Sequence, residues 1–537
     1  MRLPLLRPWA WALASLAATA SLVFTTLDPR ADAATATLPA AAVQAVAAST
    51  VEDEGADCPV GSTPSGSSSL LPDPFKRIDG TRVTSKADWR CRRAEIRELA
   101  ERTVYGQKPA KPTVTGTVSG GNITVNVSDQ GRSASFSAKV ELPSGTGPFP
   151  AVIVIGGLGA DTATIKAAGA AVINYDPLAV GREGTARTNK QGAFYTLYGN
   201  TSSTGLLMAW SWGVSRIIDV VQQSGGSVLR GDSLGVTGCS RYGKGAFVAG
   251  AFDQRIALTM PVESGTGGAP ILRGVNGESG AQPLSSAYGE QPWLGDAFGS
   301  STSSPDNLPV DTHQMIGMIA PRGLFLMENP HVDWLAARSG SVAALGGAEV
   351  YKALGAQSAI SYWSDVQDGT HCASRTEWRT PMQQSINAFL KNSGSGPGVF
   401  RVASAKAGSL SGWRDWTTPT LADGGTSGGT TSGTTSGTTT GTTAGTSAGT
   451  TTGTTAGTSA GTTTGTTAGT TSGTTSGTTS GSTGGTPGAG CSAAHRTVNS
   501  WPGGHQGEVT VRNDGASSIS GWSVGMTLAS GQTVTSL

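Results

Sequence analysis

The stretch SLGVTGCSRYGKGAFVAGAF, residues 233–252, decides the fold. Its first part is typical of a buried strand, its middle of a sharp turn at Ser240, and its last part of a helix. A strand, a turn bearing a serine and a helix form a nucleophile elbow, which exposes the serine hydroxyl at the end of the strand. The segment departs from the usual G-x-S-x-G spacing, because Tyr242 stands in the second glycine position and Gly243 follows it. Taken alone, it would also suit an ordinary turn serine.

Strand and helix patterns alternate on both sides of this elbow, within residues 56–398. Continuous apolar runs predict strands, and apolar residues at helical spacing predict helices. Strands are expected at 150–157, 170–177, 233–240, 256–265, 323–330 and 358–371, and helices at 204–221, 244–252 and 383–391. This alternation predicts an α/β fold with a mostly parallel sheet. Catalytic groups of such sheets collect beyond the carboxyl ends of the strands.

A serine nucleophile needs a base, and His371 follows a late strand, which is the chain order of an α/β-hydrolase. Cys239 directly precedes Ser240, and Cys372 directly follows His371. If these cysteines pair, their Cα atoms lie about 5.5–6 Å apart, and the flanking residues lie about 3.8 Å further along each chain. The serine and the histidine would then be within side-chain reach of each other.

The third member of such a triad is a carboxylate that holds the histidine tautomer. Glu263 ends the strand after the elbow, whereas Glu328 and Asp333 follow the next predicted strand. Spacing alone favours Glu328 or Asp333.

Charge and cysteine content exclude several functional classes. The formal net charge is +1, so there is no electrostatic basis for binding nucleic acid or an anionic membrane. No C-x-x-C occurs, and the five histidines lack metal-ligand spacing, so neither a metal nor an organic cofactor is expected. In a secreted protein the five cysteines favour disulfides. The simplest pairing is Cys58–Cys91 with Cys239–Cys372, which leaves Cys491 over.

Residues 1–33 are typical of a secretory signal, with a retained anchor helix as the alternative. Arg2 and Arg7 give a basic start, residues 9–24 are largely apolar, and Ala31-Asp32-Ala33 offers a cleavage site. Secretion to the extracellular space is therefore expected, without a membrane span.

Composition divides the rest of the chain into segments. We expect a flexible lead-in at 34–55, an α/β domain at 56–398 and a connecting segment at 399–423. Residues 424–490 are nearly pure Gly, Thr and Ser, which predicts a disordered tether. Residues 491–537 have an all-β pattern and suggest the front half of a module that is cut short.

Five motifs resemble the glucuronoyl esterases, carbohydrate esterase family 15. They lie in the family order and are GCSRYGKGA (238–246), PVESGTGG (261–268), EQPWL (290–294), DWL (333–335) and GTHCA (369–373). The resemblance implies a three-layer α/β-hydrolase sandwich in a secreted, monomeric enzyme. Its implied reaction is hydrolysis of esters between the glucuronic acid of glucuronoxylan and lignin alcohols.

The resemblance also assigns roles to residues. It implies that Glu263, in the ESG motif, is the acid, against the spacing argument, and that Arg241 stabilises the oxyanion. It implies both disulfides named above. For the uronic acid it implies four binding residues, of which Gln282 lies in a loop whose length differs from the family pattern. These are Lys244, Gln282, Glu290 and Trp334.

The C-terminal piece is similar to the front half of a family 2 cellulose-binding module. Such modules stack exposed tryptophans on glucan rings, and Trp501 matches one of them, which implies cellulose as a partner. EVTVRN (508–513) and WSVGMTL (522–528) predict strands, with Trp522 in the core.

Two other functions compete with this interpretation. An acetyl xylan esterase would need no uronate pocket, which Lys244, Glu290 and Trp334 imply. A non-catalytic polysaccharide-binding protein on a decayed hydrolase scaffold conflicts with the intact Ser240 and His371.

Overall fold

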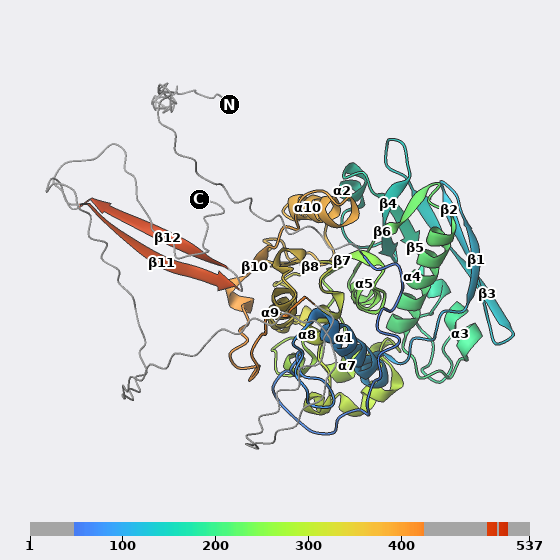
Figure 1. Cartoon of the computed structure of the whole chain (residues 1–537), viewed down its shortest axis with the longest axis horizontal. Helices are drawn as coiled ribbons and strands as arrows, with labels where there is room; N and C mark the ends of the chain where they lie inside the picture. Colours follow the sequence, from blue (N-terminus) through green and yellow to red (C-terminus); the bar gives the residue numbers. More distant parts are fainter. Residues whose placement is uncertain (1–47, 424–490, 502–503, 514–537) are drawn as a thin grey trace, which may run out of the picture. The chain divides into compact units, whose positions relative to one another are not determined.

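The computed structural model describes residues 48–423, 491–501 and 504–513 (Figure 1). The expected signal at 1–33, the linker at 424–490 and the predicted strand at 522–528 with Trp522 lie outside the described residues. Within the described ranges, no helix has both the length and the apolar character needed to cross a bilayer.

A ten-stranded mixed sheet forms the framework of residues 48–423, with the strand order β1-β2-β3-β5-β4-β6-β7-β8-β9-β10. The first three strands are antiparallel, and the run from β5 to β10 is parallel. The strands are β1 (Thr113–Val118), β2 (Asn122–Asp129), β3 (Arg132–Glu141), β4 (Phe149–Ile155), β5 (Ala171–Tyr175), β6 (Leu229–Cys239), β7 (Ile256–Val262), β8 (Gly323–Met327), β9 (Ile360–Ser364) and β10 (Phe400–Val402).

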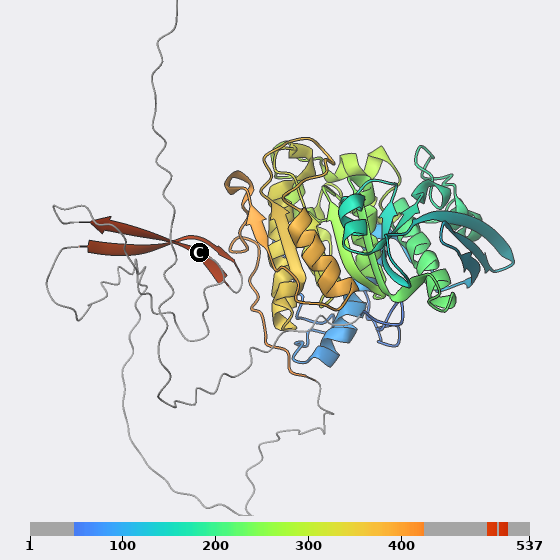
Figure 2. The ribbon, with the colours of Figure 1, turned by 90° about the horizontal axis from the view of Figure 1, so that it is seen from above.

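Helices cover both faces of this sheet. They are α1 (Lys86–Ala100), α2 (Thr162–Ala167), α3 (Ala193–Tyr198), α4 (Leu206–Gln223), α5 (Arg241–Phe252), α6 (Leu272–Val275), α7 (Leu284–Glu290), α8 (Thr312–Ile319), α9 (Ala337–Ala353) and α10 (Arg379–Leu390). Helices α2 and α10 pack together on one face, and α4 and α5 pack on the other (Figures 1 and 2). The domain therefore has the three layers of an α/β-hydrolase, as predicted.

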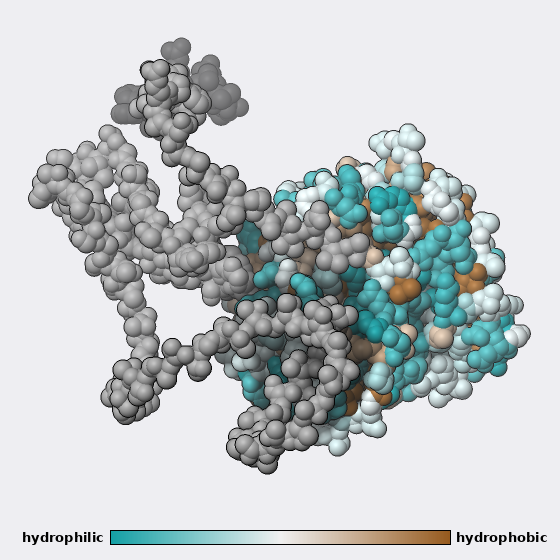
Figure 3. All heavy atoms as spheres, viewed as in Figure 1, coloured by the Kyte–Doolittle hydropathy of each residue, from teal (hydrophilic) through white to brown (hydrophobic). Residues whose placement is uncertain are grey.

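The central strands of the sheet are buried on both faces. Every residue of β4 and β7 is buried, which explains why these strands are continuous apolar runs rather than alternating patterns. Trp210 and Trp212 of α4 are both buried, so core packing accounts for the pair. The visible surface of the domain is mostly hydrophilic or neutral, with small hydrophobic spots (Figure 3).

The domain extends past both boundaries expected from composition. In the predicted lead-in, the Glu52 carboxylate lies 2.7 Å from Lys108 Nζ and also pairs with Arg216. In the predicted connecting segment, β10 pairs with β9, and the buried Trp416 donates from Nε1 to Leu71 O at 3.1 Å. These contacts join residues that are far apart in the sequence, and such contacts leave no periodic pattern in it.

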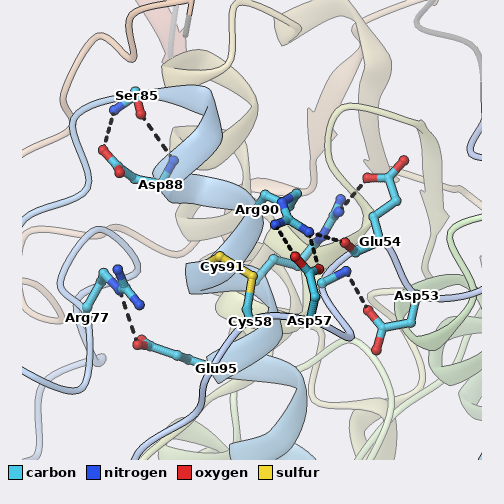
Figure 4. The surroundings of a disulfide bond; sticks show 12 residues. Asp53, Glu54, Asp57, Cys58, Arg77, Ser85, Asp88, Arg90, Cys91 and Glu95 are labelled. Carbon is cyan, nitrogen blue, oxygen red and sulfur yellow. Dashed lines mark hydrogen bonds and ion pairs between the residues drawn. A yellow bond between two sulfur atoms is a disulfide. The ribbon is translucent and has the colours of Figure 1, made fainter. Parts of the chain in front are cut away.

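A disulfide fastens the N-terminal segment to α1 (Figure 4). Cys58 and Cys91 are bonded, with Cα atoms 5.3 Å apart, which confirms the predicted pairing. Beside this bridge, Arg90 donates from Nη2 to Asp57 Oδ2 at 2.8 Å. We call the Cys58–Cys91 bond the N-terminal disulfide.

Two further differences concern strands. The antiparallel β1, β2 and β3 were not predicted, although exposed and buried residues alternate along β2 and along the second half of β3, as in a sheet with one solvated face. The predicted strand at 358–371 ends earlier, because β9 stops at Ser364 and a loop carries His371. Residues 491–513 include an antiparallel pair, β11 (Cys491–Trp501) and β12 (Gly504–Asn513).

Candidate active site

Ser240 occupies a strained turn between β6 and α5. Its φ is +58°, a conformation that costs a non-glycine residue about 1–3 kcal/mol. Its N–H donates to Val262 O at 3.0 Å, which holds the turn against β7. A Cβ on Gly238 would lie 2.2 Å from Tyr242 O, and one on Gly243 would lie 2.5 Å from Val262 O. The chain therefore has the strand, turn and helix geometry of a nucleophile elbow.

The departure from the usual elbow spacing has a packing reason. The Tyr242 ring presses on the backbone of Gly156, where an added Cβ would lie 2.2 Å from the ring. The same ring lies 5.7 Å from that of Trp210. Tyr242 thus fills the space between the elbow and the end of β4, and Gly243 supplies the close approach to β7 instead.

A second disulfide, Cys239–Cys372, joins the elbow to the histidine loop. The two Cα atoms are 5.9 Å apart, which confirms the predicted bridge. We call it the active-site disulfide. In the described part of the chain no hydrogen bond links Ser240 Oγ to His371, and such bonds often tighten only once substrate is bound.

Glu263 holds the histidine. Its Oε2 lies 2.7 Å from His371 Nδ1 and accepts from Cys372 N–H at 2.9 Å. Its Oε1 accepts from Arg375 Nη2 at 3.1 Å. The carboxylate is buried and follows β7 with a φ of +46°. These three contacts orient the carboxylate toward Nδ1.

The two acids that spacing favoured lie elsewhere. Glu328 is buried and accepts from Ser264 Oγ at 3.3 Å. Burial, with a smaller contribution from the charge of Glu263, raises the pKa of Glu328 to about 8. Asp333 pairs with Lys406 Nζ at 2.8 Å on the surface. Of the three candidates, Glu263 is the one whose carboxylate contacts the His371 ring.

Ser240 opens into a pocket of about 260 Å³. Its walls come from α5, from the loops after β7 and β8, and from the end of α7. They combine charged, amide and aromatic groups. The lining residues are Ser240, Arg241, Lys244, Gly265, Gln282, Glu290, Trp293, Trp334 and Leu335. The structure therefore brings the predicted oxyanion residue and all four predicted binding residues to one cavity beside the serine.

Lys244 lies at the buried side of this pocket. Its Nζ donates to Ser264 O and lies 5.6 Å from the centre of the Trp293 ring. Burial lowers the pKa of Lys244 to about 8, and the negative charge of Glu290 opposes that shift.

Gln282 and Glu290 form a pair at the edge of the pocket, because Gln282 Nε2 donates to Glu290 Oε2 at 2.6 Å. The Gln282 N–H also donates to Trp334 O at 3.2 Å. The altered loop length thus leaves Gln282 at the pocket. The Trp334 side chain is 54% exposed and lies edge-on to His371, with ring centres 5.9 Å apart.

Three residues of the site were missed from the sequence. Trp293 lies within the EQPWL motif, and Arg375 follows His371 closely, so both carried a local signal. No local feature of the sequence marked Glu183 as a site residue. Glu183 accepts from Trp293 Nε1 at 2.6 Å through Oε1 and pairs with Arg241 Nε at 3.2 Å through Oε2.

Donor atoms of Cys239, Glu263, His371 and Cys372 lie within 4.8 Å of one another. They do not suit a metal ion, since both sulfurs are joined in a disulfide and a ligating cysteine must be a thiolate. The carboxylate is also already engaged with the imidazole.

The sequence is similar to known proteins of one family and, at its C-terminal end, to a carbohydrate-binding domain. Residues 125–355 match the family model for glucuronyl esterase of fungi, and residues 491–537 match that for a cellulose binding domain. The 4-O-methyl-glucuronoyl methylesterase of Neurospora crassa is 38% identical over 369 residues, covering 67% of this chain and 92% of that protein. That of Podospora anserina is 38% identical over 431 residues, covering 74% and 86%.

Solved structures of the same family also resemble this chain. The glucuronoyl esterase catalytic domain from Hypocrea jecorina is 37% identical with a TM-score of 0.62, covering 67% of this chain and 99% of that one. The Sporotrichum thermophile glucuronoyl esterase, solved in complex with methyl 4-O-methyl-β-D-glucopyranuronate, is 37% identical with a TM-score of 0.63, covering 68% and 100%. With the elbow, the Glu263–His371 pair and the active-site disulfide in place, these relatives show that the chain belongs to the glucuronoyl esterase family.

Proposed function

We propose that this chain is a serine esterase that hydrolyses esters between the (4-O-methyl-)glucuronic acid of glucuronoxylan and lignin alcohols. One observation carries the proposal. The elbow serine opens into a pocket whose polar and aromatic groups suit a sugar acid, with Lys244, Gln282 and Glu290 able to meet hydroxyls. The named activity of the relatives supports the same reaction.

The mechanism assigns roles to the residues at the elbow. His371 takes the Ser240 proton at Nε2, because its Nδ1 is engaged by Glu263 at 2.7 Å. Ser240 Oγ then attacks the uronate carbonyl carbon, and the carbonyl oxygen becomes an oxyanion. Arg241 stabilises that charge through its backbone N–H and its guanidinium.

Collapse of the tetrahedral intermediate completes the cycle. His371 gives the proton to the departing alcohol, which leaves a glucuronoyl ester on Ser240. Water, activated by the same histidine, then attacks this ester and frees the acid and the serine. Throughout, Glu263 offsets the positive charge that forms on the imidazole.

Localisation and partners belong to the same proposal. Two disulfides suit an oxidising, extracytoplasmic compartment, which agrees with a signal at 1–33 and secretion. The match of residues 491–537 to a cellulose binding domain supports a tether to cellulose, with Trp501 as a stacking residue. We further propose a monomer with the segment order set out from composition, its α/β domain widened to residues 48–423.

Hydrolysis of benzyl glucuronate tests the reaction. We expect turnover by the full chain and its loss in Ser240→Ala, with the fold checked by circular dichroism. Acetate release from acetylated xylan without uronate ester hydrolysis would instead identify an acetyl xylan esterase. Binding to cellulose with turnover of neither ester would identify a non-catalytic polysaccharide-binding protein.

A further inference from the structure

We propose that Glu183 is a positioning residue that aims the Arg241 guanidinium at the oxyanion and ties it to the wall of the substrate pocket. The inference rests on the proposed function, because it concerns the same site. Glu183 lies in the loop between β5 and α3, far in sequence from the elbow.

Glu183 uses both of its carboxylate oxygens in the site. Oε2 lies 3.2 Å from Arg241 Nε, and Oε1 accepts from Trp293 Nε1 at 2.6 Å. Trp293 in turn lines the pocket and faces the Lys244 ammonium, 5.6 Å from its ring centre. One side chain therefore connects the oxyanion residue with the wall that holds the sugar.

Arg241 needs such a partner. Its side chain is 46% exposed, so an unpaired arginine here would sample many rotamers. Glu183 contacts Nε, and the two terminal amino groups, which carry the other four N–H donors, are not committed to it. Holding Nε while leaving the terminal groups to the substrate is how a guanidinium is preorganised for a developing negative charge.

The Glu183 loop is itself docked on the pocket wall. Gly184 N–H donates to Gln291 Oε1 at 2.7 Å. Arg187 donates from Nη1 to Leu294 O at 2.7 Å and to Asp296 Oδ1 at 3.0 Å. The carboxylate is thus presented from a fixed loop rather than from a free chain segment.

Charge and positioning predict opposite effects of removing Glu183. A carboxylate near the oxyanion repels it and partly neutralises Arg241, so electrostatics alone predict faster turnover without Glu183. Positioning predicts slower turnover, because Arg241 then spends most of its time away from the oxyanion. The sign of the change in kcat therefore decides between them.

A double-mutant cycle provides the test. We expect Glu183→Ala to lower kcat on benzyl glucuronate about ten-fold, equivalent to ~1.4 kcal/mol, with a smaller change in KM. In the Arg241→Ala background the same substitution should change kcat less than two-fold, since there is no guanidinium left to aim. Glu183→Gln, which keeps the size but only one acceptor oxygen, should fall in the same direction.

Glu141→Gln is the matched control, because Glu141 forms an exposed ion pair with Lys166 and lines no part of the pocket. We expect its kcat within two-fold of the parent. An unchanged or raised kcat in Glu183→Ala, an equal loss in the Arg241→Ala background, or a ten-fold loss in Glu141→Gln would overturn the proposal. The cycle is also run on p-nitrophenyl acetate, which forms the same oxyanion, so failure on uronate esters alone would count against the proposed substrate and not against Glu183.

Discussion

Replacing Glu263 by glutamine separates the proposed catalytic acid from its neighbour Glu328. Glutamine is nearly isosteric with glutamate but offers one acceptor oxygen and one NH₂ group. In the structure Oε2 accepts from His371 and Cys372, and Oε1 accepts from Arg375. The amide cannot satisfy both sides, so a buried donor always faces a donor.

The orientation of the amide sets the size of the effect. With its oxygen toward His371, its NH₂ opposes the Arg375 guanidinium, which costs about 1–3 kcal/mol of stability. The imidazolium that forms during reaction then meets a neutral group in place of a carboxylate. With its NH₂ toward Nδ1, the ring must carry its proton on Nε2 and cannot accept one from Ser240. Either way we expect kcat to fall between about 10³- and 10⁴-fold.

Glu328→Gln is the control for this substitution. The pKa of Glu328, raised to about 8 by burial and by the charge of Glu263, leaves the group mostly protonated at pH 7. An amide then replaces a neutral acid, and its oxygen can still accept from Ser264 Oγ. We expect kcat to change less than about three-fold, because the amide keeps this hydrogen bond and removes no charge from the site.

Steady-state kinetics on benzyl glucuronate at pH 7 measure both variants, with thermal unfolding followed in parallel. A large loss in Glu328→Gln together with near-parent turnover in Glu263→Gln would refute the assignment. The acid would then belong to the strand after β7, as spacing suggested.

Three further predictions concern the bridges, the pocket and the domain boundary. Replacing both cysteines of the active-site disulfide by serine should lower kcat more than the same change in the N-terminal disulfide. The bridges close loops of 133 and 33 residues, which stabilise the folded state by about 5 and about 4 kcal/mol. Equal losses of kcat in the two variants would mean general unfolding. Because burial lowers the pKa of Lys244 to about 8, its ammonium is present below pH 8 and lost above, so KM should rise between pH 7 and 9. The KM of Lys244→Met should not change over this pH range. A constant KM in the parent would contradict the role of Lys244 in substrate binding. A chain ending at Asp423 should hydrolyse soluble esters at the parent rate while losing retention on cellulose in a pull-down, and loss of turnover would show that the hydrolase needs residues 424–537.

Several features of the fold were predictable because they depend on local pattern. The apolar runs of β4 and β7 and the elbow at Ser240 follow from residue types that are adjacent in the chain. The joining of the elbow to the histidine loop was predictable for a covalent reason, since Ser240 and His371 each stand beside a cysteine of one bridge. The antiparallel strands β1, β2 and β3 were missed, although the alternation along β2 and β3 is a local pattern too.

Other features needed the packed chain. Glu52 and Trp416 help to hold the domain ends through long-range contacts, which no sequence periodicity predicts. Glu183 reaches Arg241 and Trp293 from a distant loop, and the direction of its side chain depends on how that loop docks.

The identity of the acid divides the two kinds of information most clearly. By itself the sequence determined that a carboxylate would follow one of the strands after the elbow, because the carboxyl ends of parallel strands share one edge of the sheet. It left Glu263, Glu328 and Asp333 open until family motifs favoured the first. The tertiary structure decided the contact: a left-handed backbone at Glu263 and donors from His371 and Arg375 direct its carboxylate to the imidazole. Side-chain direction at such a turn depends on neighbours that are remote in sequence, and only the folded chain brings them together.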